Sequence, residues 1–238
     1  VLESSIFGVH SVAATNNNLT LSSPDNASLQ VFIKKGDSSA QGCKFVLKST
    51  SGLISDLESE VFYDVYKNSK WNISFRVTRK EGNKFLTPDS NTKYEIRFMG
   101  KNYLSTELAN EFLLTSDITK VQYDSFNQSN KSVYVGAHRT NFTGTVLNKS
   151  DVKMVDFNVW STALTDSQID QRARNFTIDG YNNNYKKEFL SSEVDKYSNL
   201  LSRHTLDTLS APDASGLIRV PDASRGSQSD REHYGNLR

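Results

Sequence analysis

The residues of this chain best suited to bond-breaking chemistry are carboxylates at alternate positions. Glu58-Ser59-Glu60 and Glu193-Val194-Asp195 each hold such a pair. On a strand, residues two apart face the same side, where one carboxylate can act as nucleophile and another as acid on a glycosidic bond. The full set, Glu-x-Asp-x-x-Glu, needs a third acid, but Ser198 stands in that position after Asp195, and Glu60 has no third partner. We therefore expect no glycosidase activity.

Other catalytic patterns are also missing from the sequence. It contains no Gly-rich phosphate loop, no His-Glu-x-x-His, no Cys-x-x-Cys and no Gly-x-Ser-x-Gly. The four histidines lack the spacing of metal ligands; they are His10, His138, His204 and His233. We expect a chain that is not an enzyme and uses no cofactor, while the sequence leaves metal binding open.

Composition places the chain among globular proteins and narrows its partners. Hydrophobic residues make up 36% and charged residues 23% of the 238 residues, and the formal net charge is +1. Such a balance offers no basic field to nucleic acid, and Lys34-Lys35 and Lys186-Lys187 are too short to supply one. No apolar run approaches the roughly 20 residues that cross a bilayer. We expect neither nucleic-acid nor membrane partners.

A single cysteine, Cys43, rules out a disulfide within the chain. Secreted modules of this size often carry disulfides, so the composition favours assembly in a reducing compartment. The first residue is Val1 rather than Met, and no signal peptide opens the chain. We expect a processed product or a piece of a larger protein.

Apolar and polar residues alternate with a period of two through the first two-thirds of the chain, as in strands with one buried face. The clearest run places Trp71, Ile73, Phe75 and Val77 on one side. The predicted strands are Ser5–Val12, Leu29–Ile33, Lys44–Lys48, Glu60–Tyr63, Trp71–Thr78, Tyr94–Phe98, Phe112–Thr115, Ser132–Ala137 and Val152–Trp160. Short alternating strands separated by Asn-, Gly- and Pro-rich turns are typical of an all-β antiparallel sandwich.

Helix is predicted only late in the chain. Thr165 can cap a short helix over Asp166–Arg174, with Gln168 completing a capping box. Apolar residues at helical spacing predict a second helix over Tyr185–Ser202, which we expect to serve assembly. Ala211–Arg238 is too polar to build a core. A flexible linker and an extended arm that orders against a neighbouring subunit both remain open for it.

The stretch from Ser132 to Gly180 carries a family pattern. In order it holds a strand ending in glycine, a Phe-x-Gly hairpin, a strand ending in tryptophan and a Leu-Thr-x-x-x-Ile helical turn. The residues are Gly136, Phe142, Gly144, Asp151–Trp160, Leu164, Thr165 and Ile169. Together with the upstream strand Lys70–Phe75, this pattern resembles laminin G-like jelly rolls of the concanavalin A-like class.

The resemblance implies an all-β fold, an antiparallel jelly-roll β-sandwich with a short C-terminal helix and an extended arm. It implies a jelly roll over 1–182, a helical appendage over 183–206 and an extended or flexible arm over 207–238. Calcium is implied by the resemblance alone, because no position here matches a ligand motif of the family.

The sequence of residues 134–144, followed by Lys149–Lys153, is similar to that of lectin-like domains in structural proteins of tailed bacteriophages. This resemblance implies a non-enzymatic virion component that assembles with other virion proteins or with copies of itself, and that binds surface glycans or a host surface. The alternative is a carbohydrate-binding or cell-adhesion module of a secreted, extracellular protein. Eight Asn-x-Ser/Thr sequons favour that alternative.

We expect any glycan or receptor site on loops at an edge of the sandwich, because binding residues gather on loops held by a rigid scaffold. The polar loop before Phe142 offers His138, Arg139 and Asn141, although it could also simply turn the chain. Stacking on sugars and packing in the core are competing interpretations of Trp71 and Trp160. Weaker stacking candidates are aromatic residues predicted in exposed loops: Tyr103, Tyr123, Phe126 and Phe142.

Overall fold

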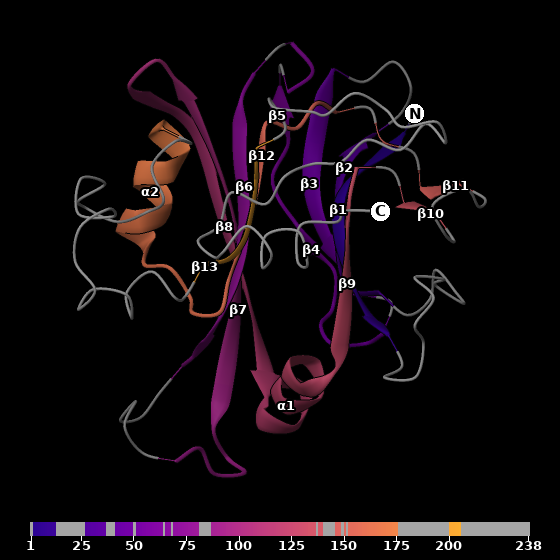
Figure 1. Cartoon of the computed structure of the whole chain (residues 1–238). Helices are drawn as coiled ribbons and strands as arrows, with labels where there is room; N and C mark the ends of the chain where they lie inside the picture. Colours follow the sequence, from indigo (N-terminus) through magenta and orange to yellow (C-terminus); the bar gives the residue numbers. More distant parts are fainter. Residues whose placement is uncertain are drawn as a thin grey trace, which may run out of the picture. The chain divides into compact units, whose positions relative to one another are not determined.

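The computed structural model of the chain describes residues 2–12, 27–36, 41–49, 51–63, 65–67, 69–80, 87–136, 138–139, 146–148, 150, 152–175 and 200–205. The chain divides into two compact units, Val1–Val152 and Lys153–Arg238. Strands dominate the described part of unit 1, whereas the described part of unit 2 holds two strands and a helix. Every strand pair within the described ranges is antiparallel (Figure 1). The prediction of a mostly-β chain with antiparallel sheets is therefore confirmed.

The larger sheet of unit 1, which we call sheet A, has six strands. Five follow the order β4-β3-β2-β1-β9, and β5 pairs with the same edge of β3 as β4 does. The strands are β1 (Glu3–Val12), β2 (Ala27–Lys35), β3 (Gly42–Lys48), β4 (Leu57–Glu58), β5 (Phe62–Tyr63) and β9 (Asn130–Val135). The strand predicted over Glu60–Tyr63 is thus shorter, and β4 precedes it.

The smaller sheet, sheet B, has the order β6-β7-β8. Its strands are β6 (Trp71–Arg79), β7 (Lys93–Leu104) and β8 (Glu107–Thr119). β7 and β8 form a long hairpin whose turn contains Ser105 at a φ of 58°. A further two-stranded sheet in unit 1 consists of β10 (His138–Arg139) and β11 (Val146–Asn148).

Aromatic rings join the two sheets in the interior of unit 1. The ring of Phe45 on β3 lies 4.7 Å from that of Trp71 and 5.2 Å from that of Phe112, measured between centroids. Phe62 on β5 contacts the same two rings at 5.0 and 5.9 Å. Aromatic rings contribute large apolar areas to a core, so this cluster holds sheet A against sheet B. The contacts favour core packing over sugar stacking for Trp71.

The predicted inward face of β6 agrees with a second contact between the sheets. Phe75 stacks on Phe7 of β1 with centroids 5.8 Å apart. β6 is an edge strand of sheet B, and all nine of its residues are half-buried.

A helix that the sequence pattern does not predict, α1 (Lys120–Gln128), follows β8 directly. The Thr119 hydroxyl accepts a hydrogen bond from the backbone N–H of Gln122, whose side-chain oxygen accepts one from the Thr119 N–H. These reciprocal bonds satisfy donors that the first turn of a helix leaves open. The prediction that Tyr123 and Phe126 lie in a loop is therefore wrong.

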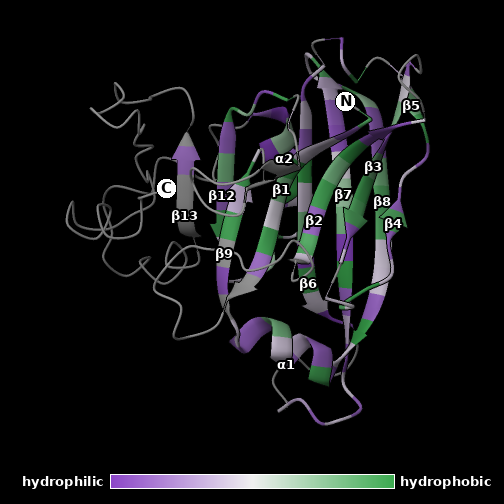
Figure 2. Ribbon diagram, turned by 90° about the vertical axis from the view of Figure 1, so that its right-hand side faces the viewer, coloured by the Kyte–Doolittle hydropathy of each residue, from purple (hydrophilic) through white to green (hydrophobic). Residues whose placement is uncertain are grey.

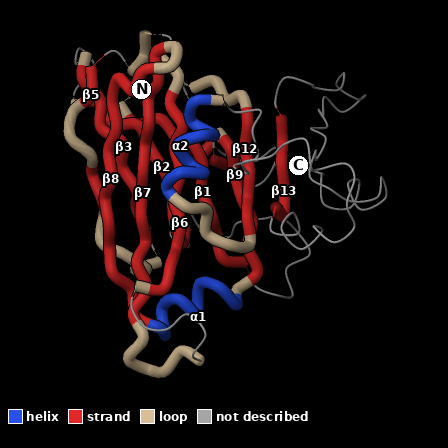
Figure 3. Tube along the Cα trace, turned by 90° about the vertical axis from the view of Figure 1, so that its left-hand side faces the viewer, coloured by secondary structure: helices blue, strands red, loops and turns tan. Residues whose placement is uncertain are grey.

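Contacts with a strand of sheet B and with the segment between two strands of sheet A position α1. Tyr123 stacks on Tyr94 of β7 at 3.8 Å, and the Gln122 amide donates to the Leu53 carbonyl oxygen, between β3 and β4. Figures 2 and 3 accordingly show α1 beneath the ends of the strands of unit 1.

In unit 2, β12 (Asp156–Trp160) pairs with β13 (Leu200–Thr205), and α2 (Asp166–Arg174) follows β12. The predicted helix and its capping box of Thr165 and Gln168 are both confirmed. The strand predicted over Val152–Trp160 begins only at Asp156.

The predicted second helix, Tyr185–Ser202, is wrong at its end, because Leu200–Ser202 belongs to β13. A strand there agrees with pairing to β12, which outweighs the helical spacing of the apolar residues. The rest of that prediction, the boundaries at 182 and 206 and the arm Ala211–Arg238 lie outside the described residues.

A buried ion pair links β12 to α2. Arg172 Nη2 lies 2.5 Å from Asp156 Oδ2, and the two side chains are only 6% and 7% exposed. The guanidinium also lies over the Trp160 ring, 4.9 Å from its centroid, and the Asn158 amide donates to Asp156 Oδ2. Trp160 thus packs against its own unit.

Candidate functional site

The face of sheet A that points away from sheet B, here called the outer face, carries a network of ion pairs. Because Phe45 points towards sheet B, its neighbours Lys44 and Val46 on β3 point the opposite way. The register places Lys34 and Phe32 of β2 beside these two residues. Figure 2 looks onto this side of the sheet and shows polar and apolar segments alternating along β1, β2 and β3.

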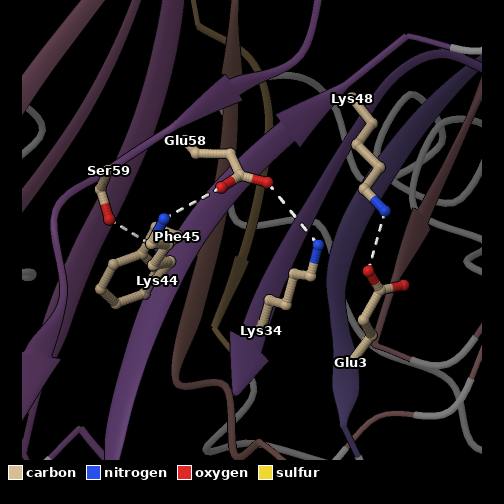
Figure 4. A network of polar contacts seen from close by, with 7 residues as sticks. All are labelled: Glu3, Lys34, Lys44, Phe45, Lys48, Glu58 and Ser59. Carbon is tan, nitrogen blue, oxygen red and sulfur yellow. Dashed lines mark hydrogen bonds and ion pairs between the residues drawn. The ribbon is translucent and has the colours of Figure 1, made fainter. Parts of the chain in front are cut away.

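Two apolar side chains, Phe32 and Val46, form the centre of the outer face. They are 3% and 0% exposed. Lys48 Nζ lies 2.8 Å from Glu3 Oε1 and 5.2 Å from the centroid of the Phe32 ring (Figure 4). A lysine can lay its aliphatic stem on apolar surface while its charge stays in water. The Lys48–Glu3 pair therefore covers Phe32.

A second ion-pair group lies at the β2–β4 side of the outer face. The Glu58 carboxylate lies 3.2 Å from Lys44 Nζ and 3.7 Å from Lys34 Nζ, so that one acid bridges two strands (Figure 4). The hydrogen bond from Lys44, and the charges of both lysines, hold the pKa of Glu58 below its ordinary value. Glu58 is therefore ionised at neutral pH. Its side chain is 38% exposed, so ligands in solution can reach it.

Ser59 fixes Glu58 beside Lys44. The Phe45 N–H donates to the Ser59 hydroxyl at 2.9 Å, and the Ser59 N–H donates to the Phe45 carbonyl oxygen at 2.9 Å. Ser59 itself is 3% exposed. These bonds continue the β3–β4 pairing by one residue and hold the chain that leads from Glu58 to β5.

A small apolar patch adjoins these charges at the edge of the outer face, and we call Gly42, Val61 and Tyr63 the edge patch. Tyr63 pairs with Gly42 in the sheet and is 69% exposed, while Val61 is 44% exposed. Phe62, between them in sequence, is 6% exposed because it points into the aromatic cluster. Alternation therefore sends one ring inward and turns Tyr63 towards solvent.

Two of the three residues predicted as a binding site lie in the separate β10–β11 sheet, which contacts β1 of sheet A. His138 and Arg139 form β10 rather than a loop, and pair with Asn148 and Val146 of β11. Asn141 lies outside the described residues. β10 and β11 contact β1, and Figure 1 draws them on the outer side of sheet A.

Neither the edge patch nor the lysine–glutamate group stands out as a site in the sequence. Glu58 is there only half of a carboxylate pair, and Lys34 only half of a short basic run. The register of β3 with β2, β4 and β5 brings these residues together from positions far apart in the chain. Gly42, placed before an alternating run, was the one local signal for a close approach.

Of the carboxylates spaced for catalysis, Glu58 and Glu60 lie within the described residues. Glu58 is engaged by two lysines, and Glu60 is exposed. Glu193, Asp195 and Ser198 lie outside the described residues. Within the described ranges, no three His, Cys, Asp or Glu side chains gather closely enough to hold a metal ion. No helix of those ranges is long and apolar enough to cross a membrane.

Comparisons with protein-family models, curated proteins and solved structures find no match for this chain.

Proposed function

We propose that this chain is a non-enzymatic structural or adhesion component of a bacteriophage virion, built on a lectin-like jelly roll. Its partners are other virion proteins or copies of itself, engaged through residues 183–238, and a glycan or host surface. Unit 1 supplies the rigid scaffold for such contacts, because two sheets and an aromatic interior hold its outer face in place.

The observation that carries the proposal is the order of features from β9 to α2. β9 is followed by Gly136 at a φ of 81°, a conformation that favours glycine. β12 then ends in Trp160, and Thr165 caps α2. Laminin G-like jelly rolls have this closing sequence of features, and the resemblance to phage structural proteins rests on the same stretch.

The finer fold belongs to the same proposal. We infer that sheets A and B are the two layers of a concanavalin A-like jelly roll. Their antiparallel pairing and the aromatic contacts between them support this inference.

Antibody labelling tests the virion assignment. Antibodies raised against the purified chain should decorate tailed particles isolated from the source of the sequence, seen by electron microscopy with gold-labelled secondary antibody. Preimmune serum is the control. Particles that bind no antibody, while the same antibody detects the chain free in the culture fluid, would overturn the virion assignment.

A second candidate is a carbohydrate-binding or adhesion module of a secreted protein. Two sequon asparagines, Asn127 and Asn175, are exposed and open to glycosylation. The mass of the protein isolated from its natural source decides between the two. Added hexose and N-acetylhexosamine at Asn127 or Asn175 favour the secreted module, and the unmodified mass favours the virion component.

A further inference from the structure

We propose that Tyr63 is the stacking platform of a carbohydrate subsite, and that Lys34, Lys44 and Glu58 hydrogen-bond the hydroxyl groups of the same sugar. The subsite deepens the glycan-binding part of the proposed function and rests on it. It lies on the outer face of sheet A, apart from the residues His138, Arg139 and Asn141 predicted from the sequence.

The absence of a side chain at Gly42 leaves room for the Tyr63 ring. A Cβ at this position would lie 2.4 Å from Val61 Cγ1 and 3.3 Å from Tyr63 Cε1, so both side chains occupy space that any other residue would fill. The edge of the Tyr63 ring is thus seated over the β3 backbone. The rest of the ring stays in solvent, since the residue is 69% exposed. A ring held in this way presents apolar area with little conformational freedom to lose on binding.

The polar groups lie close enough to the Tyr63 ring for one pyranose to contact both. Gly42 and Lys44 are two residues apart on β3 and face the same side, which separates them by about 7 Å. Lys34 and Glu58 flank Lys44. Ammonium groups donate hydrogen bonds and an ionised carboxylate accepts them. Together the three side chains can donate to one sugar hydroxyl and accept from an adjacent one.

The occupant that suits this combination is a saccharide rather than a protein. A pyranose ring has a face of C–H groups for Tyr63 and a rim of hydroxyls for the ions. A stable protein interface buries roughly 800 Å² on each partner around an apolar centre. Phe32 and Val46, at the centre of the outer face, are covered already. Among the described residues from β2 to β5, the exposed large apolar side chains are Val61 and Tyr63, which is the scale of one or two sugar rings.

A glycan array probed with the full chain tests the subsite. We expect binding to one or more oligosaccharides, and Tyr63→Ala should weaken it by about tenfold. Tyr63→Phe keeps the ring and should retain binding within about threefold. Gly42→Val should weaken binding as Tyr63→Ala does, since its side chain displaces the ring. Lys44→Ala should lower binding to the same sugars, both alone and combined with Tyr63→Phe. Leu113→Ala, at a residue 55% exposed on β8 of sheet B, is the matched control and should bind normally.

The outcomes separate the subsite from the proposed function. Unchanged glycan binding by Tyr63→Ala, with a thermal midpoint equal to that of the parent chain, overturns the subsite and leaves glycan binding standing. Absence of binding by the parent chain overturns both the subsite and the glycan part of the function, whereas the virion assignment is decided by antibody labelling. A change of oligomeric state in Tyr63→Ala, without a change in glycan binding, would identify the edge patch as a contact between copies and also overturn the proposal.

Discussion

Different kinds of contact stabilise the interior of each of the two units. In unit 1, Phe45, Phe62, Trp71 and Phe112 pack between two sheets with centroid distances of 4.7 to 6.3 Å. In the described part of unit 2, a buried ion pair between Asp156 and Arg172 joins a strand to a helix, and the buried apolar residues there are the smaller Leu164, Ile169 and Ala173.

The two kinds of contact predict different responses to substitution. Apolar packing is non-directional, so neighbouring rings can adjust to a lost one and the cost follows the volume removed. A buried ion pair is directional and compensates a large desolvation cost, so removing one partner is far worse than replacing both. In unit 1 the cost of a substitution should therefore follow the volume removed, whereas in unit 2 it should depend on whether one or both partners of the ion pair are replaced.

The largest effect is expected from Phe45→Ala. Phe45 is fully buried and contacts rings of both sheets, so its loss should cost about 4–5 kcal/mol of unfolding free energy. Phe75→Ala should cost less, because β6 is half-buried. Urea unfolding of both variants measures the difference. Equal losses would contradict a single dense aromatic centre.

Asp156→Ala should destabilise unit 2 by about 3–4 kcal/mol, because the Arg172 guanidinium loses a carboxylate in a buried place. Replacing both residues by leucine should recover much of that loss. Hydrogen exchange of the α2 amides, followed by mass spectrometry, reports on this unit separately from unit 1. If the double variant exchanges as fast as Asp156→Ala, the ion pair is not what holds α2 to β12.

The two capping boxes compare the units with matched chemistry. Thr119→Ala in unit 1 and Thr165→Ala in unit 2 should each cost about 1 kcal/mol, since each removes the acceptor for a first-turn N–H. Serine at either position keeps the hydroxyl and is the control. Circular dichroism during thermal unfolding measures the loss. A threefold difference between the two alanine variants would show that something other than the cap limits one helix.

The smallest effect is expected from Glu58→Gln on the outer face. Exposed ion pairs contribute about 0.2–1 kcal/mol, and this pair is well exposed. The pKa of Glu58 is lowered in the folded chain, so its stabilisation is present above the ordinary glutamate pKa of about 4.3 and is lost as the pH falls through the folded value. The stability difference between parent and variant should therefore shrink below about pH 4. A difference that persists at pH 3 would contradict the ionic origin.

Local patterns predicted the elements whose burial follows their own sequence. Alternation identified β6 and β7, and the Thr165–Gln168 spacing identified α2. The same capping spacing recurs at Thr119 and Gln122, but α1 has no buried residue and so lacks the apolar period that predicts a core helix. β13 shows the reverse case, where apolar residues at helical spacing pair as a strand.

The candidate site was harder to predict than the fold, because it depends on strand register. Glu58 and Lys44 are 14 residues apart, and Tyr63 meets Gly42 only through the β3–β5 pairing. A one-residue slip in either pairing would move these side chains to the opposite face. No spacing rule within the sequence expresses that relation.

The reactivity of Cys43 reports on local opening of sheet A. It is the chain's single cysteine, lies on β3 opposite Lys35, and is 1% exposed. Burial raises the pKa of its thiol, which further suppresses the thiolate that reacts with electrophiles. A thiol reagent can therefore modify the native chain only during moments when β3 separates from its neighbours. The rate of that reaction, divided by the rate for the unfolded chain, gives the fraction of molecules in which sheet A is open at Cys43 under native conditions, without a label or a substitution.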